Sequence, residues 1–311
     1  MKLKEWLDFW LNEYQKNSIK LKTYALYNEC INKHINPILG DYNLNDLSLE
    51  VLQKFVNAKL NNGNLQSGKG LSTASVHRML SVLKLSLNLA VSMGKCEKEF
   101  ASLVKLPKAN RKEIDAFTKD EQKQIEYVCL KKKGNYIGFI ICLYTGIRLG
   151  ELLALTWDDI DFDNNMISIN KTLGQFYING KYTSYVNSPK TRNSNRIIPF
   201  SKQLKILLQD KKKISNSKYV ISTKNGNMIR NRQYQKTFKS LLEQCGISHK
   251  GIHSLRHTFT TRSIEIGMDV KTLSEILGHC NTMITLNRYT HSMIDQKIKS
   301  INKLEMISME E

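Results

Sequence analysis

The chain lacks the features of membrane-spanning and secreted proteins. No apolar stretch among its 311 residues is long enough to span a bilayer. The N-terminal segment MKLKEWLDFW has acidic residues where a signal peptide would carry its apolar core. The six cysteines lie far apart and form no CxxC pair, so we expect reduced packing residues rather than a disulfide framework. These absences predict a cytoplasmic protein that does not associate with a membrane.

Acidic residues are few compared with basic ones. Asp and Glu number 28 against 47 Lys and Arg, which gives a formal net charge of +19 and a pI of about 9.6. Such a chain is attracted to a polyanion, and nucleic acid is favoured over an anionic membrane surface. The charge is +6 for residues 1–108 and +13 for the remainder. We therefore expect both parts to contact the same polyanion, clamping a duplex from opposite sides.

The composition divides the chain into two domains. Residues 107–113 are poor core formers, and they separate two stretches of helical periodicity. We predict a helical first domain over residues 1–108, a linker over 109–115 and a second domain over 116–311. The length of the chain allows two cores of ordinary size.

Apolar residues recur at helical spacing throughout the first domain. Four helices of a small bundle are expected, at residues 6–14, 23–38, 46–60 and 72–91. The last of these carries His77, Arg78 and Lys84 beside an apolar face. These basic side chains either contact phosphates or form a solvated face, and charge favours neither interpretation.

The second domain is expected to begin with helices. Thr118 and Glu121 have the spacing of a capping box, which predicts a helix start. A strongly apolar helix follows at residues 136–144 and is broken at Thr145-Gly146. Arg148 then opens another helix, with Glu151 three residues later on the same face.

After Trp157 the pattern changes to that of short strands. Strands are expected near residues 166–169, 176–178, 182–185 and 197–198, with Asn179-Gly180 as a hairpin turn. Lys190 falls in the last turn of this small antiparallel sheet. The expected fold class is therefore mainly α with a small antiparallel β-sheet, arranged as a helical domain followed by a mixed α+β domain.

Beyond Pro199 the pattern is helical again. A helix at residues 254–266 places Arg256 three residues after His253, so both side chains project from one face. A short helix at 270–277 ends at Gly278, with His279 just after it. A further helix is expected to reach Tyr289.

Six polar residues of the second domain together form a chemically coherent set: Arg148, Lys190, His253, Arg256, His279 and Tyr289. They supply two guanidiniums, a lysine, two imidazoles and a phenol, which is what transferring a phosphodiester to tyrosine without a metal requires. A phenol with a pKa near 10 is a poor nucleophile at neutral pH, so it needs a base or a strongly positive site.

The motifs that carry these residues are TGIRLGELLAL, SPKTRNSNRIIPF, HSLRHTFTT, LGH and NRYTH. In type, order and approximate spacing they resemble those of the tyrosine recombinases, also called the phage integrase family. The helical first domain resembles that family's core-binding (SAM-like) domain. The chain starts almost directly at these helices, so we expect no N-terminal arm-binding domain.

The resemblance implies a role for each matching residue. Tyr289 would attack the scissile phosphate and leave a 3′-phosphotyrosine and a free 5′-hydroxyl. Arg148 and Arg256 would hold the non-bridging oxygens, a task suited to rigid, permanently charged forks. Lys190 would protonate the departing 5′-oxygen.

The remaining site residues would assist this chemistry. His253 would act as a general base or as a donor to the phosphate, His279 would bond the same phosphate, and Glu151 would orient its neighbours. No metal, ATP or other cofactor is implied, because the protein link conserves the phosphodiester energy. The implied partners are a specific double-stranded DNA site, three further copies in a homotetramer on DNA, and an accessory excision protein. In solution a monomer is expected.

The C-terminal segment, residues 292–311, is expected to form an amphipathic helix. Its apolar residues fall on one helical face: Ile294, Ile298, Ile301 and Leu304. The helix would pack on its own domain or dock on a neighbouring protomer, and the sequence leaves both arrangements open. In the tyrosine recombinases such a segment docks in trans, which is the arrangement that we favour.

Two alternative chemistries use similar residues. Histidines and cysteines of the second domain could instead form a zinc site. The candidate ligands are His253, His257, His279, His291, Cys245 and Cys280. We disfavour zinc, because the two arginines would repel a cation. A type IB topoisomerase uses a similar residue set as a monomer, and a DNA-binding module without catalysis would not need Tyr289. The favoured function is site-specific recombination of a mobile element, by integration, excision or resolution.

Overall fold

The computed structural model describes residues 1–108, 116–178, 181–187, 195–248 and 250–278. The chain divides into two compact units. Unit 1 comprises Met1–Lys112 with Phe176–Thr183, and unit 2 comprises Glu113–Gln175 with Ser184–Glu311. The linker predicted over residues 109–115 lies outside the described residues, as does the predicted Asn179-Gly180 turn.

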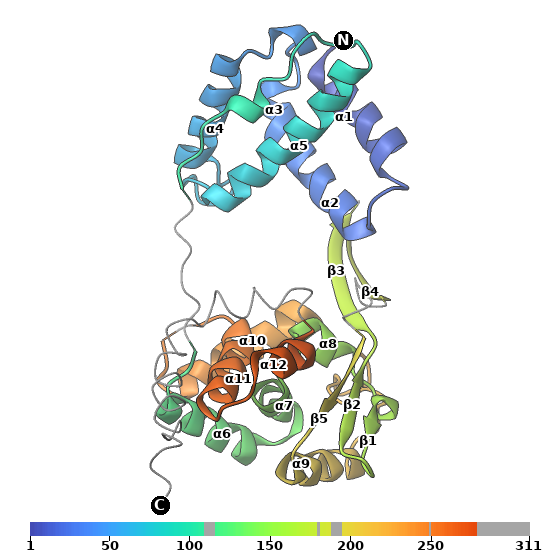
Figure 1. The fold of residues 1–311 in the computed structure, drawn as a ribbon, viewed down its shortest axis with the longest axis vertical. Helices are drawn as coiled ribbons and strands as arrows, with labels where there is room; N and C mark the ends of the chain where they lie inside the picture. The colour runs from blue at the N-terminus through green and yellow to red at the C-terminus, as the bar shows by residue number, and fades with distance from the viewer. Residues whose placement is uncertain (109–115, 179–180, 188–194, 249, 279–311) are drawn as a thin grey trace, which may run out of the picture. The chain divides into compact units, whose positions relative to one another are not determined.

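Residues 1–108 form helices, as predicted from their periodicity (Figure 1). The α-helices are α1 (Leu3–Phe9), α2 (Leu21–Cys30), α3 (Asn36–Leu39), α4 (Leu49–Asn62) and α5 (Thr73–Ser92). A wider π-helical turn at Trp10–Gln15 extends α1, and another at Ile31–Ile35 joins α2 to α3. With these segments counted as continuous, the four expected helices are present. Short 3-10 turns lie at Leu44–Asp46 and Ala101–Leu103.

The longest helix of this unit, α5, has the cap and the buried face that its sequence predicts. The Ser72 hydroxyl accepts a bond from the Ser75 amide and caps the helix start. The predicted apolar positions are all buried, namely Val76, Leu80, Leu83 and Leu87. Trp6 and Trp10 from the first helical segment are buried in the same core. His77, Arg78 and Lys84 lie exposed on the other side of α5.

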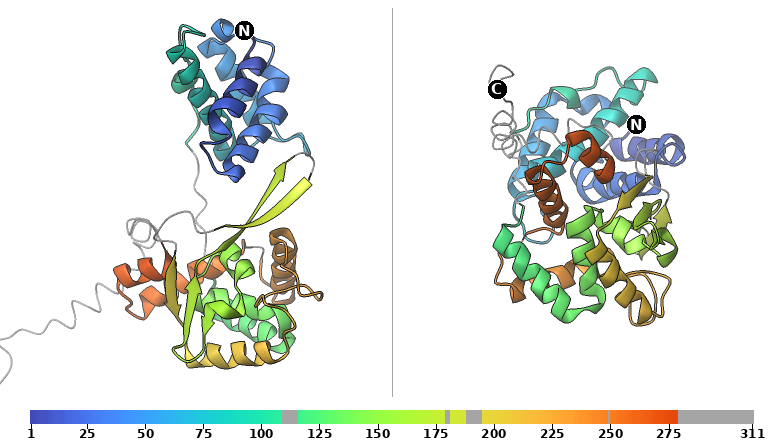
Figure 2. Two further views of the ribbon diagram at one scale, coloured as in Figure 1. Left: turned by 90° about the vertical axis from the view of Figure 1, so that its right-hand side faces the viewer. Right: turned by 60° about the horizontal axis from the view of Figure 1, so that its bottom comes forward.

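Unit 2 contains the remaining helices of the described chain. They are α6 (Lys119–Lys132), α7 (Ile137–Thr145), α8 (Leu149–Ala154), α9 (Lys202–Lys213), α10 (Asn231–Gln244), α11 (His253–Glu265) and α12 (Val270–Leu277). Single 3-10 turns occur at Gly134–Tyr136 and Trp157–Asp159. The apolar α7 lies in the middle, in contact with α6, α8, α9 and α11 (Figures 1 and 2). The Thr118–Glu121 capping box is present at the start of α6, as expected.

The strands form two small sheets rather than one. They are β1 (Ile160–Asp161), β2 (Met166–Ile169), β3 (Thr172–Ile178), β4 (Lys181–Asn187) and β5 (Arg196–Pro199). One sheet has the order β1-β2-β5 and is antiparallel, whereas β3 pairs with β4. In the first sheet Ile198 pairs with Ile167, and Arg196 pairs with Ile169. The fold class is as predicted, mainly α with small antiparallel sheets.

The five described cysteines carry free thiols: Cys30, Cys96, Cys129, Cys142 and Cys245. Four of them are buried, and complete burial raises the pKa of the Cys142 thiol to about 12. They serve as packing residues, as expected. Among the described residues no helix combines the length and apolar character needed to cross a bilayer.

Gly146 ends α7 in the left-handed conformation, with φ of 63°. A Cβ at this position would lie 2.5 Å from Phe259 Cδ1 and 2.9 Å from Leu277 Cδ2, so there is no room for a side chain. Gly246 has a similar φ of 66° with nothing within 4 Å of a Cβ. Gly146 and Gly246 therefore share the same backbone strain, but only a side chain at Gly146 would also be crowded.

We predict that Gly246→Ala costs about 1 kcal/mol of unfolding free energy, the strain of a left-handed residue. Gly146→Ala should cost about 3 kcal/mol, because overpacking adds to the same strain. Urea denaturation of both variants measures the difference. Equal losses would contradict the close packing of α7 against α11 and α12.

Candidate active site

The turn between α7 and α8 positions the first arginine of the site. Gly146 reverses the chain after α7, and Arg148 becomes the residue that precedes α8. The Arg148 amide donates to Glu151 Oε2 at 2.8 Å, and its Nη1 donates to Glu151 Oε1 at 2.9 Å. The Arg148 side chain is 36% exposed. Glu151 thus anchors the Arg148 guanidinium, while about a third of the side chain stays accessible.

The Glu151 carboxylate is buried between two guanidiniums. Arg196 donates from Nη2 to Oε2 at 2.7 Å and from Nη1 to Oε1 at 3.1 Å. Burial alone would raise the pKa of Glu151, but the hydrogen bonds and charge of Arg196, followed by the charge of Arg148, hold it below its usual value. Glu151 therefore stays ionised at neutral pH.

Arg256 comes from the first turn of α11 and is buried. Its Nη1 donates to the Gly146 carbonyl and its Nη2 to the Leu277 carbonyl, both at 2.7 Å. These carbonyls lie at the C-terminal ends of α7 and α12, where backbone acceptors lack helical partners and cations are favoured. Two helix ends thus hold one guanidinium.

Three successive carbonyls at the end of α12 each accept a bond from a different arginine. Ile276 accepts from Arg196 Nε at 2.6 Å and Leu277 accepts from Arg256, while Gly278 accepts from Arg148 Nη2 at 3.0 Å. The structure therefore brings the two predicted arginines together around the segment that immediately precedes His279.

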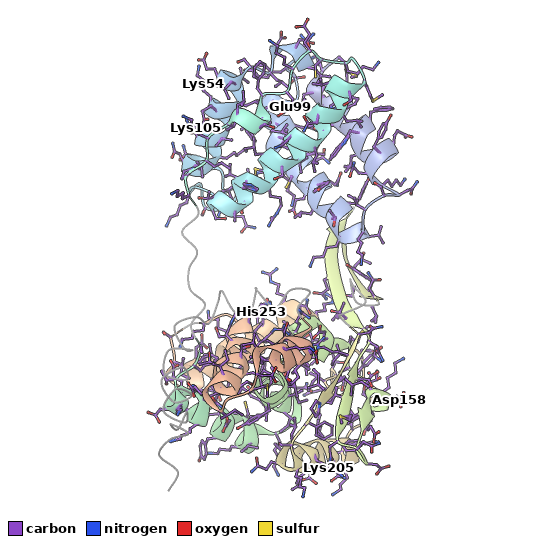
Figure 3. All side chains as sticks on the ribbon, in the orientation of Figure 1. Lys54, Glu99, Lys105, Asp158, Lys205 and His253 are labelled. Atoms are coloured by element: carbon purple, nitrogen blue, oxygen red, sulfur yellow. The ribbon has the colours of Figure 1, made fainter. Side chains whose placement is uncertain are left out.

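The other predicted site residues are only partly described. His253 opens α11, one turn before Arg256, and is exposed (Figure 3). Lys190, His279 and Tyr289 lie outside the described residues, as does the expected C-terminal helix at 292–311.

Arg196 was not predicted as part of the site. Within its motif, SPKTRNSNRIIPF, only Lys190 was predicted to belong to the site. One signal was available: in β5 Arg196 alternates with exposed Ile197 and shares a side with buried Ile198. An arginine on the inward face of a strand requires an acidic or carbonyl partner, and Glu151 with Ile276 supplies both.

The described residues contain no group of three His, Cys, Asp or Glu side chains arranged to hold a metal. Of the residues considered for zinc, His279, Cys280 and His291 lie outside that part of the chain. His257 is buried on α11.

The site carries an excess of positive charge. Two guanidiniums, of Arg148 and Arg196, share the Glu151 carboxylate, and the third, of Arg256, donates to two neutral carbonyls. Rigid, partly buried cations of this kind stabilise a phosphate on which negative charge accumulates during reaction. The arrangement suits phosphoryl transfer.

Comparison with known proteins identifies the family. The model of the phage integrase family matches residues 106–295, and that of the phage integrase N-terminal SAM-like domain matches residues 2–60. The first match covers more than half of the chain. The protein belongs to the phage integrase family, the tyrosine recombinases. It is a DNA-binding enzyme that cleaves and rejoins DNA.

Individual relatives agree with this assignment. A XerC-like tyrosine recombinase of Caldanaerobacter subterraneus subsp. tengcongensis is 29% identical over 95% of this chain and 80% of its own. The fold is similar to that of the Tn1549 transposon integrase in complex with a circular intermediate DNA, with a TM-score of 0.79, 21% identity, and 98% and 100% of the two chains covered. The fold is also similar to that of a lambda integrase chain in the structure of a tetramer bound to a Holliday junction. The TM-score is 0.69 at 20% identity, and 93% of this chain and 77% of the other are covered.

Glu151→Gln is predicted to destabilise the protein by about 3 kcal/mol at pH 7, because it leaves buried Arg196 without its anion. The lowered pKa of Glu151 fixes the pH dependence. The carboxylate's contribution is fully present above its unfolded pKa of about 4.3 and is lost as pH falls through the lower folded pKa. The difference between wild type and variant should therefore be constant from pH 7 to 5 and shrink on further acidification.

Denaturant titrations across this pH range measure the effect. Glu243→Gln is the control, since Glu243 is 64% exposed and pairs with exposed Lys239. A difference for Glu151→Gln that persists unchanged below pH 4 would show that the carboxylate is not the stabilising group.

Proposed function

We propose that the protein is a site-specific recombinase of a mobile element that exchanges DNA strands through a 3′-phosphotyrosine intermediate. The convergence of Arg148 and Arg256 on the end of α12 is the observation that carries the proposal. This arrangement leaves cationic groups fixed beside the segment that leads to His279 and, ten residues later, Tyr289.

In this proposal Tyr289 attacks the scissile phosphorus and displaces the 5′-oxygen, which takes a proton from Lys190. Arg148 and Arg256 bind the non-bridging oxygens as charge builds on the pentacovalent phosphate. Attack by the freed 5′-hydroxyl of another strand reverses the step and releases the tyrosine. One phosphodiester is exchanged for another, so the reaction needs neither ATP nor a metal.

The histidines and Glu151 support this exchange. His253 lies one turn from Arg256 and accepts the tyrosine proton or donates to the phosphate, while His279 donates to the same phosphate. Glu151 fixes the Arg148 guanidinium through two bonds.

We also propose that four protomers assemble on two duplexes and dissociate to monomers without DNA. The lambda integrase tetramer on a Holliday junction supports this arrangement. Residues 1–108 would serve as the core-binding domain, and the segment 292–311 would link neighbouring protomers. An accessory excision protein would set the direction of recombination.

Because the substrate is cellular DNA, we place the enzyme in the cytoplasm.

The nucleophile can be tested on nicked duplexes made from the DNA that flanks the gene. We expect the wild type to become covalently attached to a 3′ end, and Tyr289→Phe, which lacks the phenolic oxygen, to form no adduct. Denaturing electrophoresis detects the adduct. Added EDTA should leave the yield unchanged, and its loss would instead favour a metal site.

The same substrates distinguish recombination from related activities. Joining of strands from two duplexes supports the recombinase, whereas relaxation of supercoils by monomers without strand exchange would indicate a type IB topoisomerase. Tight DNA binding with no adduct on any flanking sequence would favour a binding module without catalysis.

The exposed basic face of α5 is proposed to contact phosphates through His77, Arg78 and Lys84. Arg78→Ala and Lys84→Ala should weaken binding to all sequences and each lower the slope of log K against log salt by about 0.9. Filter binding at several salt concentrations measures the slope. Lys54→Ala is the control, because Lys54 is 76% exposed and already pairs with Glu50. Slopes that match this control would identify the face as merely solvated.

A further inference from the structure

Arg196 is a buried arginine to which the proposed chemistry gives no task. Its side chain is only 6% exposed, compared with 36% for Arg148. Both arginines bind the Glu151 carboxylate, but only Arg148 is accessible enough to meet a phosphate. Arg196 must therefore act on the reaction, if at all, through the groups that it holds.

These groups belong to the two elements that frame the site. Through two bonds to Glu151, Arg196 holds the carboxylate that anchors Arg148 at the start of α8. Through Nε it holds the Ile276 carbonyl near the end of α12. One planar guanidinium thus connects β5 with both α8 and α12.

Close packing strengthens the second connection. Gly278 ends α12 with φ of 63°, and a Cβ at this position would lie 3.1 Å from Arg196 Cδ and Nη1. The Gly278 backbone therefore rests directly on the guanidinium, one residue before His279. A shift of Arg196 would displace this turn and the Glu151 carboxylate together.

We propose that Arg196 is a positioning residue of the recombination site, which aligns the Arg148 guanidinium through Glu151 and the end of α12 that leads to His279. This inference rests on the proposed function and extends it to a residue that does not touch DNA. Arginine suits the task, because its planar fork binds a carboxylate with two parallel bonds while Nε donates to a third acceptor. A lysine keeps the charge but cannot reproduce this geometry.

The test compares Arg196→Lys with wild type in single-turnover cleavage of nicked duplexes at saturating protein. We expect the cleavage rate to fall about 10–100-fold, as for other residues that orient a reacting group. The Kd for the duplex should be unchanged, because Arg196 is buried. Arg262→Lys is the matched control: Arg262 also bonds a carboxylate, a side-chain amide and a backbone carbonyl, through Glu265, Gln122 and Phe117. It should lower Tm and leave the cleavage rate intact.

A second substrate separates alignment from general destabilisation. A methylphosphonate at the scissile position lacks one charged non-bridging oxygen, so its cleavage depends less on the aligned arginines. The deficit of Arg196→Lys relative to wild type should shrink on this substrate. An equal deficit on both substrates, or no deficit on either, would overturn the inference.

Two further outcomes are decisive. If Arg196→Lys does not fold, Arg196→Gln, which is uncharged but planar, is compared in the same way. Should wild type form no adduct on any flanking DNA, the proposed function fails and the inference with it. If wild type and variant form the adduct equally fast, the inference alone fails.

Discussion

The buried carboxylate of Glu151 between the guanidiniums of Arg148 and Arg196 is the interaction on which the rest of the site depends. Three guanidiniums meet around the end of α12, and without compensation their mutual repulsion would separate them. Glu151 offsets one charge. Carbonyls at the C-terminal ends of α7 and α12 stabilise the others, because helix ends of this sense favour cations. The fold thus assembles positive charge by surrounding it with backbone acceptors.

Packing and electrostatics are coupled at this point. The apolar α7 is buried in the core of unit 2, and its last turn presents the Gly146 carbonyl to Arg256. Leu277, which presents the next carbonyl, is buried against Ile264 and Leu273. Cations held by packed helix ends do not have to reorganise when charge develops on a substrate, which is the condition for electrostatic stabilisation of a transition state. Substitutions in the core that shift these carbonyls would therefore shift the Arg256 guanidinium as well.

Much of this architecture was predictable from local signals. The Thr118–Glu121 capping box, the Gly146 break and the Gly278 helix end each appear where the sequence indicated them. The role of Arg196 was not apparent, because β5 has only four residues and its partner Glu151 lies 45 residues earlier in the chain. Alternation over so short a strand is a weak signal, and an ion pair between distant segments has no sequence pattern. The division of the strands into two sheets likewise depends on long-range pairing.

Arg148 and Arg256 have the same implied role, which is to bind the phosphate. Their surroundings differ, so each suits a different part of that role. Arg148 is more exposed, and Glu151 offsets part of its charge, so it suits directional hydrogen bonding to an incoming oxygen. Arg256 is more buried, and its guanidinium donates to the carbonyls of Gly146 and Leu277. In the proposed reaction this buried charge would act strongly on the scissile phosphate, because the surrounding dielectric is low. In the proposed mechanism Glu151 and Arg196 would contribute alignment rather than charge, because as a pair they are neutral.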